Sequence, residues 1–224
     1  MKLFKRLKAD ADLAWSAYTE HAFVTQLGRG ELPEDAFRHY LVQDYLFLIQ
    51  FARAYALGVY KSPTLADMRM SLDGVKAILD VELDLHVELC TGWGMTRSEL
   101  ESAPEMTQTM AYTRFVLEAG MAGDLLDLQV ALAPCIIGYA EIGAMLLDRH
   151  GTEMDGNPYR RWVEEYSGSA YQDLARAFGD WLDSTAEVYM TDARYPRLLA
   201  IFGKACALEA DFWQMGLDYP DRTL

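Results

Sequence analysis

Helix-length runs of apolar residues, separated by proline and glycine, dominate the chain. Between Phe4 and Leu27, and again from Pro33 to about Tyr60, apolar side chains recur every three to four residues, which places them on one face of an α-helix. Gly28 ends the first run, and Pro33 opens the second because proline suits the first helical turn. Convincing period-two alternation, the pattern of a strand, is missing between the turn residues. The pattern predicts an all-α protein.

Further helices follow the same punctuation. The next helix is predicted from Ser62-Pro63 to near Thr91. The remaining helices are predicted at roughly 105–119, 122–149, 158–167, 169–189 and 196–217. The stretch GTEMDGNP at 151–158 predicts a loop. Because no repeat or linker divides the chain, we expect residues 1–224 to form a single domain, a compact multi-helix bundle of about seven to nine helices.

Composition and charge narrow the class of protein. Hydrophobic residues make up 51% of the 224 residues, enough for a sizeable core, and the net charge of −14 disfavours nucleic acid and anionic membranes as partners. The N-terminus lacks the apolar segment of a secretory signal, and no stretch approaches about 18 uninterrupted apolar residues. The three cysteines, Cys90, Cys135 and Cys206, have no short paired spacing. We therefore expect a cytoplasmic protein without a disulfide framework or zinc finger.

Two carboxyl groups interrupt apolar helical faces. Asp44 lies on the apolar stripe of the helix that begins at Pro33, and Glu209 lies between Ala205 and Phe212 on one face of the last helix. A buried charge costs several kcal/mol unless it is partnered, so each of these positions requires a reason. The pattern leaves two interpretations open for each residue, a functional carboxyl group or a structural one. The structural one is a carboxylate tied to a nearby arginine or backbone group for Asp44, and an ion pair for Glu209.

A cysteine, a proline and a tyrosine coincide in one predicted helix. Pro134 should distort that helix, because it lacks an N–H group and clashes with the preceding turn. Cys135 follows it, and Tyr139 lies four residues further on the same face. A buried free cysteine is more often packing than chemistry, but the combination favours a site. Tyr112, Tyr139 and Tyr166 are either core residues or stacking partners for a flat heterocycle.

The histidines give a weak metal signal. They are scattered at His21, His39, His86 and His150. A di-iron helical bundle needs two Glu-x-x-His pairs on facing helices, whereas this chain offers only Glu82 with His86 and Asp35 with His39, each spaced four apart. We therefore expect ordinary surface or core histidines and no metal site. A glycine-rich phosphate loop, a Gly-x-Ser-x-Gly elbow and a basic stripe are also missing.

Five motifs, in this order and spacing, resemble one known family. They are Tyr40-Leu41-Val42-Gln43-Asp44, Tyr112, Pro134-Cys135-Ile136-Ile137-Gly138-Tyr139, Glu165-Tyr166-Ser167-Gly168 and Glu209-Ala210-Asp211-Phe212-Trp213. Together they resemble the TenA / thiaminase II family over roughly residues 10 to 217. No single motif is specific, but their order and spacing are.

The resemblance implies a fold, a reaction and a set of partners. The fold would be heme-oxygenase-like, and the protein usually a homotetramer. The reaction would be hydrolysis of 4-amino-5-aminomethyl-2-methylpyrimidine to 4-amino-5-hydroxymethyl-2-methylpyrimidine in thiamin salvage, with slower cleavage of thiamin itself. This chemistry requires no metal or organic cofactor. The expected partners are therefore a small pyrimidine and other copies of the chain, with no nucleic acid and no membrane.

The resemblance also implies roles for individual residues. Cys135 matches the nucleophile, Glu209 the acid/base group and Asp44 the carboxylate that binds the pyrimidine. The pocket wall is matched by Phe47, Tyr112, Tyr139, Tyr166 and Phe212. Many relatives carry a tyrosine where this chain has Phe47, so stacking is retained but one hydroxyl group near the cysteine is missing.

Two other classes of function compete with hydrolysis. A heme-oxygenase-like, cofactor-binding oxidase would require inward-facing histidines or a metal site, which the scattered histidines disfavour. A non-catalytic, pyrimidine-binding regulatory protein would leave Cys135 dispensable.

Overall fold

The computed structural model describes residues 2–92, 95–151 and 154–219, and in these ranges it contains helices and no strand. The α-helices are α1 (Leu3–Asp10), α2 (Asp12–Thr19), α3 (Ala22–Arg29), α4 (Glu34–Lys61), α5 (Leu65–Ala77), α6 (Leu83–Thr91), α7 (Arg97–Ser102), α8 (Thr107–Ala122), α9 (Leu125–Ala133), α10 (Tyr139–His150), α11 (Arg160–Ser167), α12 (Ser169–Tyr189) and α13 (Tyr195–Leu217). Two π-helical turns join them, η1 (Ile78–Glu82) between α5 and α6 and η2 (Pro134–Gly138) between α9 and α10. The predicted all-α class is confirmed.

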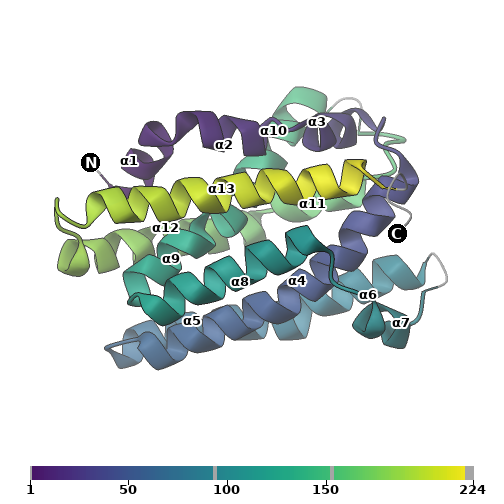
Figure 1. Ribbon diagram of the computed structural model, residues 1–224. Helices are drawn as coiled ribbons and strands as arrows, with labels where there is room; N and C mark the ends of the chain where they lie inside the picture. Colours follow the sequence, from purple (N-terminus) through teal and green to yellow (C-terminus); the bar gives the residue numbers. More distant parts are fainter. Residues whose placement is uncertain (1, 93–94, 152–153, 220–224) are drawn as a thin grey trace.

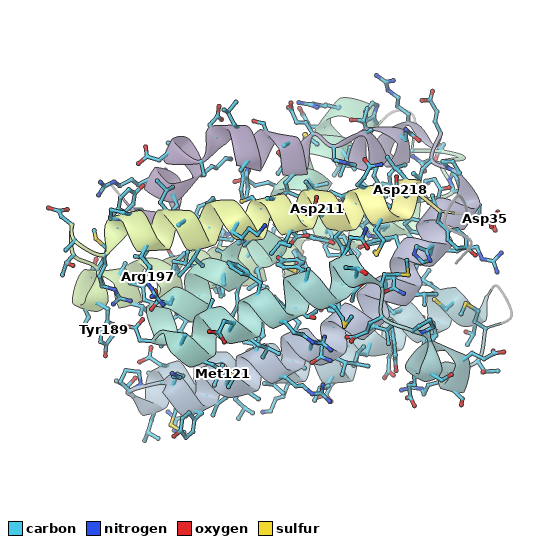
Figure 2. All side chains as sticks on the ribbon, in the orientation of Figure 1. Asp35, Met121, Tyr189, Arg197, Asp211 and Asp218 are labelled. Atoms are coloured by element: carbon cyan, nitrogen blue, oxygen red, sulfur yellow. The ribbon has the colours of Figure 1, made fainter. Side chains whose placement is uncertain are left out.

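The long helix α13 runs through the middle of the bundle. It packs against α2 on one side and against α8, α9 and α4 on the other (Figure 1). Glu209, which is 1% exposed, lies on its buried face with Leu198, Phe202 and Phe212, as the spacing predicted. Asp211, two residues later, is exposed (Figure 2). Burying each large apolar side chain of this face contributes roughly 1.5–3 kcal/mol.

The prediction of a single helix from Phe4 to Leu27 is wrong, because this segment forms the three helices α1, α2 and α3. The backbone leaves helical geometry at Ala11 and Glu20, where φ is −110° and −109° and ψ is 25° and 20°. At the start of α3 the His21 side chain accepts a hydrogen bond from the backbone N–H of Phe23 at 3.2 Å. The apolar spacing continues across both breaks, so periodicity alone does not reveal them.

The sequence did not predict the short helix α7. With the breaks described above, the described residues contain thirteen α-helical segments, where about seven to nine helices were expected. A local signal for α7 was present. Thr96 and Glu99 form a capping box, in which the Thr96 hydroxyl accepts from the Glu99 N–H at 3.2 Å and the Glu99 carboxylate accepts from the Thr96 N–H at 2.7 Å. Six residues are too few for a hydrophobic period to stand out.

The distortion predicted at Pro134 takes the form of the π-helical turn η2. Proline has no N–H to donate, and its ring clashes with the carbonyl of the preceding turn, so widening the helix locally accommodates it. The helix then continues through α10, and Tyr139 is its first residue. The turn η1 also widens the α5–α6 helix, although its residues Ile78–Glu82 include no proline. Both π-helical turns contribute side chains to one cavity, through Cys135 and Glu82.

The helical run Leu125–His150 is long and apolar enough to cross a membrane by length and composition, and its most apolar 18-residue window has a mean hydropathy of 1.9. In the fold, 72% of its most apolar window is buried by other parts of the chain, as in a core helix of a soluble protein. The loop predicted at 151–158 includes positions 152–153, which lie outside the described residues; its later part turns at Gly156, where φ is +92°, into α11.

Candidate active site

A narrow cavity lies between α4, α5, η1, η2, α10, α11 and α12. It holds about 40 Å³ of space for the centres of water molecules. A buried water needs roughly 10–15 Å³ of such space, so the cavity has room for a few waters. The wall is mainly aromatic and aliphatic, with two carboxyl groups, Asp44 and Glu82, and one thiol, Cys135. A mainly apolar pocket with a few convergent polar groups is the usual form of a small-molecule site.

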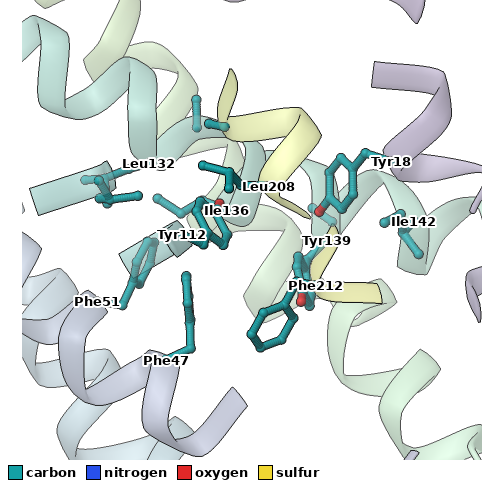
Figure 3. Close-up of a cluster of buried hydrophobic side chains, with 14 of the residues drawn as sticks. Tyr18, Phe47, Phe51, Tyr112, Leu132, Ile136, Tyr139, Ile142, Leu208 and Phe212 are labelled. Carbon is teal, nitrogen blue, oxygen red and sulfur yellow. The ribbon is translucent and has the colours of Figure 1, made fainter. Parts of the chain in front are cut away.

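The structure sorts the eight predicted site residues into two layers. The cavity wall includes Asp44, Cys135, Tyr139 and Tyr166. The layer behind it includes Phe47, Tyr112, Glu209 and Phe212. Figure 3 shows Phe47, Tyr112, Phe212 and Tyr139 converging from four helices. The chain therefore brings all eight residues into one region, although they come from α4, α8, η2, α10, α11 and α13.

Cys135 is partly exposed, and it faces the cavity from η2. Burial raises its pKa well above the usual value for a thiol, and the charges of Glu209, Asp44 and Glu82 raise it further. The resting group is therefore a neutral thiol. Because only the thiolate is strongly nucleophilic, any reaction at this sulfur requires a base that accepts its proton.

Glu209 is a buried carboxyl group with one fixed partner. The Tyr112 hydroxyl donates a hydrogen bond to its Oε1 at 2.8 Å. Burial raises the pKa of Glu209 from 4.5 to about 8; the hydrogen bond from Tyr112 opposes this shift and the charge of Asp44 adds to it. A carboxyl group with such a pKa can both accept and return a proton near neutrality. It is also close enough to Cys135 for its charge to raise the pKa of the thiol.

Asp44 is held by side chains from other helices and from its own. The Tyr40 hydroxyl donates to Asp44 Oδ2 at 3.1 Å, and His86 Nε2 lies 2.7 Å from the same oxygen. The Tyr40 oxygen accepts from the Trp162 indole N–H at 3.3 Å and lies 3.4 Å from the Tyr139 hydroxyl. The partners of Asp44 are therefore a histidine and a tyrosine. The structural interpretation of this residue predicted an arginine or a backbone group instead.

His86 was expected to be an ordinary surface or core residue, and its role beside Asp44 was missed. It is 3% exposed, and its Nδ1 lies 2.9 Å from the carbonyl oxygen of Glu82. Burial lowers its pKa, but the hydrogen bond to Asp44, the charge of that carboxylate and the Glu82 carbonyl raise it, and the net shift is upward. A signal existed in its three- to four-residue spacing from the buried Leu83 and Cys90. Within the described ranges, no three His, Cys, Asp or Glu side chains meet as a metal site would require.

Aromatic rings surround the polar groups. Tyr139 packs edge-on against Tyr166 with ring centroids 4.9 Å apart, and Phe47 lies 5.0 Å from the Tyr112 ring and 5.8 Å from the Phe212 ring. Such contacts make the wall rigid. Two further tyrosines line the cavity, Tyr55 and Tyr171, and were not among the predicted site residues. Nothing in the local pattern separates these two from other buried tyrosines.

The raised pKa values of two carboxyl groups predict that the protein loses stability as the pH rises. Burial raises the pKa of Glu209 from 4.5 to about 8 and that of Glu82 from 4.5 to about 7. In this window the folded protein retains protons that the unfolded chain has released, so the free energy of unfolding falls by up to a few kcal/mol between pH 4.5 and about 8. The raised pKa of His86 acts in the same direction above 6.5.

Denaturant titrations at several pH values between these limits measure the effect. The Glu209→Gln variant cannot release this proton, so its stability is expected to depend less on pH than that of the wild type. Identical pH dependence in the two proteins would contradict the buried, protonated state of Glu209.

Comparison with known proteins identifies relatives over nearly the whole chain. Residues 8–219 match the sequence profile of the TENA/THI-4/PQQC family. An aminopyrimidine aminohydrolase of Halalkalibacterium halodurans is 34% identical, covering 96% of this chain and 95% of its own. The crystal structure of a protein described as a TenA family transcription regulator, from Silicibacter sp. TM1040, is 44% identical, with a TM-score of 0.92 over 96% of both chains.

A more distant structure bears on the fold alone. A domain from Shewanella denitrificans with a heme oxygenase-like fold superposes with a TM-score of 0.75, covering 99% of this chain and 98% of its own at 13% identity. The predicted heme-oxygenase-like architecture is thereby confirmed.

Proposed function

Because the chain belongs to the TENA/THI-4/PQQC family, we propose that it is a hydrolase of aminopyrimidines in thiamin salvage. The proposed reaction converts 4-amino-5-aminomethyl-2-methylpyrimidine to 4-amino-5-hydroxymethyl-2-methylpyrimidine and ammonia, with thiamin cleavage as a slower activity. The H. halodurans relative carries the name of this class of enzyme. The observation that carries the proposal is the position of the Cys135 thiol in a small aromatic cavity, close to the buried carboxyl group of Glu209 and the fixed carboxylate of Asp44.

A nucleophilic sulfur solves a specific chemical problem. The amine leaves from a carbon attached to an aromatic ring, where direct displacement by water is slow. A thiolate that adds to the ring pushes electrons toward this carbon and expels the amine. Water then adds to the same carbon, and the thiolate leaves the ring. One difficult step is thereby divided into easier ones, and the balance is substrate plus water to alcohol plus ammonia.

Glu209 supplies the proton transfers in this scheme. Its carboxylate form takes the proton of the Cys135 thiol, either directly or through a water molecule. The protonated form then gives a proton to the leaving amine, and the regenerated carboxylate activates the incoming water. Its pKa of about 8 suits both roles, because neither form is strongly disfavoured near neutral pH.

Asp44 binds the edge of the pyrimidine. Its Oδ2 already accepts from Tyr40 and contacts His86, whereas Oδ1 has no hydrogen-bond partner among the described residues. Oδ1 is therefore available to accept a hydrogen bond from the 4-amino group. The Tyr139 and Tyr166 rings hold the flat ring in place and exclude water.

Substitution Asp44→Asn is expected to weaken substrate binding more than turnover. It removes the charge that the 4-amino group contacts, and a hydrogen bond to a charged group contributes about 1.5–3 kcal/mol. The KM for the aminopyrimidine should rise about 10- to 100-fold, with a smaller fall in kcat. Ammonia release at varied substrate concentration measures both constants. An unchanged KM would remove Asp44 from the binding site.

Ammonia release by the wild-type protein is the direct test of the proposed function. Purified protein is incubated with the aminomethylpyrimidine and, separately, with thiamin. Release from the first, with slower cleavage of the second, is the expected result. Turnover of neither compound would contradict aminopyrimidine hydrolysis.

We also propose that residues 1–224 form a single domain of a cytoplasmic homo-oligomer, the tetramer usual in the family. The outer helix α5 supports association. It lies at the edge of the bundle in Figure 1 and exposes several large apolar side chains. They are Leu65, Met68, Met70 and Leu72. Leu65, Met68 and Leu72 lie three to four residues apart, on one face of α5, and an exposed apolar face is typical of an interface between proteins.

A further inference from the structure

The His86 ring lies between two acceptor groups, which determines where its protons are. Nδ1 is 2.9 Å from the Glu82 carbonyl oxygen, and Nε2 is 2.7 Å from Asp44 Oδ2. A carbonyl oxygen can only accept, so Nδ1 must carry a hydrogen. The contact between Nε2 and Oδ2 then needs one more proton. That proton makes either a cationic ring beside an anionic Asp44 or a neutral ring beside a protonated Asp44.

The surroundings of Asp44 favour the ion pair. The Tyr40 hydroxyl donates to the same Oδ2 at 3.1 Å, so two donors converge on one oxygen. The Tyr40 oxygen receives the Trp162 N–H, which can only donate. The single Tyr40 hydrogen is therefore shared between Asp44 Oδ2 at 3.1 Å and the Tyr139 hydroxyl at 3.4 Å, and the shorter contact with a carboxylate is the stronger one. Two donors on one oxygen match a carboxylate. The upward shift of the His86 pKa agrees with a charged ring.

Both members of the His86–Asp44 pair are shielded from solvent. His86 is 3% exposed and Asp44 is 4% exposed. The titratable groups that act on His86 are Asp44 from α4 and Glu82 from η1. Burying two charges is costly, and the cost is offset here because both His86 nitrogens and Oδ2 are hydrogen-bonded. A buried pair of this kind is more useful for orienting a group than for stabilising the fold.

We propose that His86 is a positioning residue that holds Asp44 as an anion, with Oδ2 occupied and Oδ1 alone presented to the substrate. This inference rests on the proposed function and refines its substrate class. An anionic Oδ1 offers the pyrimidine an acceptor and no donor. It therefore selects a ring whose edge donates a hydrogen bond, as a 4-amino group does, and rejects a 4-oxo ring, which presents an acceptor at that position.

Two substitutions of His86 separate its two hydrogen bonds. In His86→Gln the side-chain amide nitrogen can take the place of Nε2 and keep a donor for Asp44. In His86→Asn the amide nitrogen takes the place of Nδ1, keeps the bond to the Glu82 carbonyl and loses the contact with Asp44. The two variants are similar in polarity, so a general loss of packing should affect both.

Calorimetric binding of 4-amino-5-hydroxymethyl-2-methylpyrimidine and of its 4-oxo analogue is the first readout. The Kd of the amino compound and the KM for hydrolysis should rise about 10-fold in His86→Asn and stay within about 3-fold of wild type in His86→Gln. The preference for the amino over the oxo ring should fall in His86→Asn only. Equal behaviour of the two variants, when both are folded by circular dichroism, would overturn the proposal.

A second readout does not depend on activity. Nitrogen-15 NMR of the unliganded wild-type protein reports whether both ring nitrogens of His86 carry protons at neutral pH. A doubly protonated ring is expected, and a neutral ring would overturn the ion pair. If the wild type binds no aminopyrimidine, the proposed function fails, whereas intact binding with a neutral His86 refutes only the present inference.

Discussion

The substitution Cys135→Ala is expected to reduce ammonia release from the aminomethylpyrimidine by at least about 1,000-fold, because it removes the atom that forms the covalent bond. The cavity otherwise remains, since alanine is smaller and the rest of the wall belongs to other side chains. Substrate binding should therefore persist while turnover stops. Single-turnover measurements of ammonia, with product binding measured separately, distinguish these two quantities.

Cys90→Ala is the matched control. Cys90 is fully buried on α6 and is not part of the cavity wall. Its loss should lower the free energy of unfolding by roughly 1 kcal/mol and leave the rate unchanged. Full activity in Cys135→Ala would refute the assignment of Cys135 as the nucleophile.

The second large effect is expected for Glu209→Gln. Glutamine has nearly the same shape and can still accept a hydrogen bond from Tyr112, but it cannot exchange a proton. The rate constant kcat should fall about 100- to 10,000-fold, the usual range for loss of a general acid or base. The KM should change little, because glutamine keeps the size of the side chain and its hydrogen bond from Tyr112. A large rise in KM with unchanged kcat would indicate a binding role.

Tyr112→Phe tests the same carboxyl group without removing it. The hydrogen bond from Tyr112 lowers the pKa of Glu209, so its loss should raise that pKa above about 8. If the carboxylate form of Glu209 accepts the thiol proton, activity rises with pH through this pKa. The rising limb of the kcat profile should then shift to higher pH in the variant. If the rising limb stays at the same pH, a group other than Glu209 determines the pH dependence of kcat.

The burial of Glu209 illustrates a conflict between stability and activity. A carboxyl group with a pKa raised by burial destabilises the folded state at the pH at which it must ionise. Glu209→Gln is therefore expected to be more stable than the wild type near pH 8 and far less active. Sites that need a shifted pKa commonly carry such a cost.

Much of the helical architecture could be predicted because it depends on local chemistry. The start of α4 after Pro33, the inward face of α13 with Glu209 and the distortion at Pro134 all follow from spacing within one helix or from the missing N–H of proline. The same reasoning failed at Ala11 and Glu20, where an unbroken apolar spacing runs over two helix ends.

For the candidate site, the sequence likewise identified residues from local chemistry but did not establish what each residue does. Asp44, Cys135 and Glu209 were recognisable in the sequence, because each is a polar or reactive group on an otherwise apolar helical face. Their roles as binding group, nucleophile and acid/base group came from the family resemblance and stay predictions that the variants above test.

Only the tertiary structure decided which side chains meet. His86 and Asp44 are 42 residues apart and Tyr112 and Glu209 are 97 apart, and neither pair leaves a trace in helical periodicity. Likewise, the packing of α4, η1, η2 and α12 placed Glu82 in the cavity wall and Phe47 behind it. A sequence pattern reports which face of a helix avoids water. Which helix that face then contacts depends on long-range packing, and hydrogen bonds between helices follow from it.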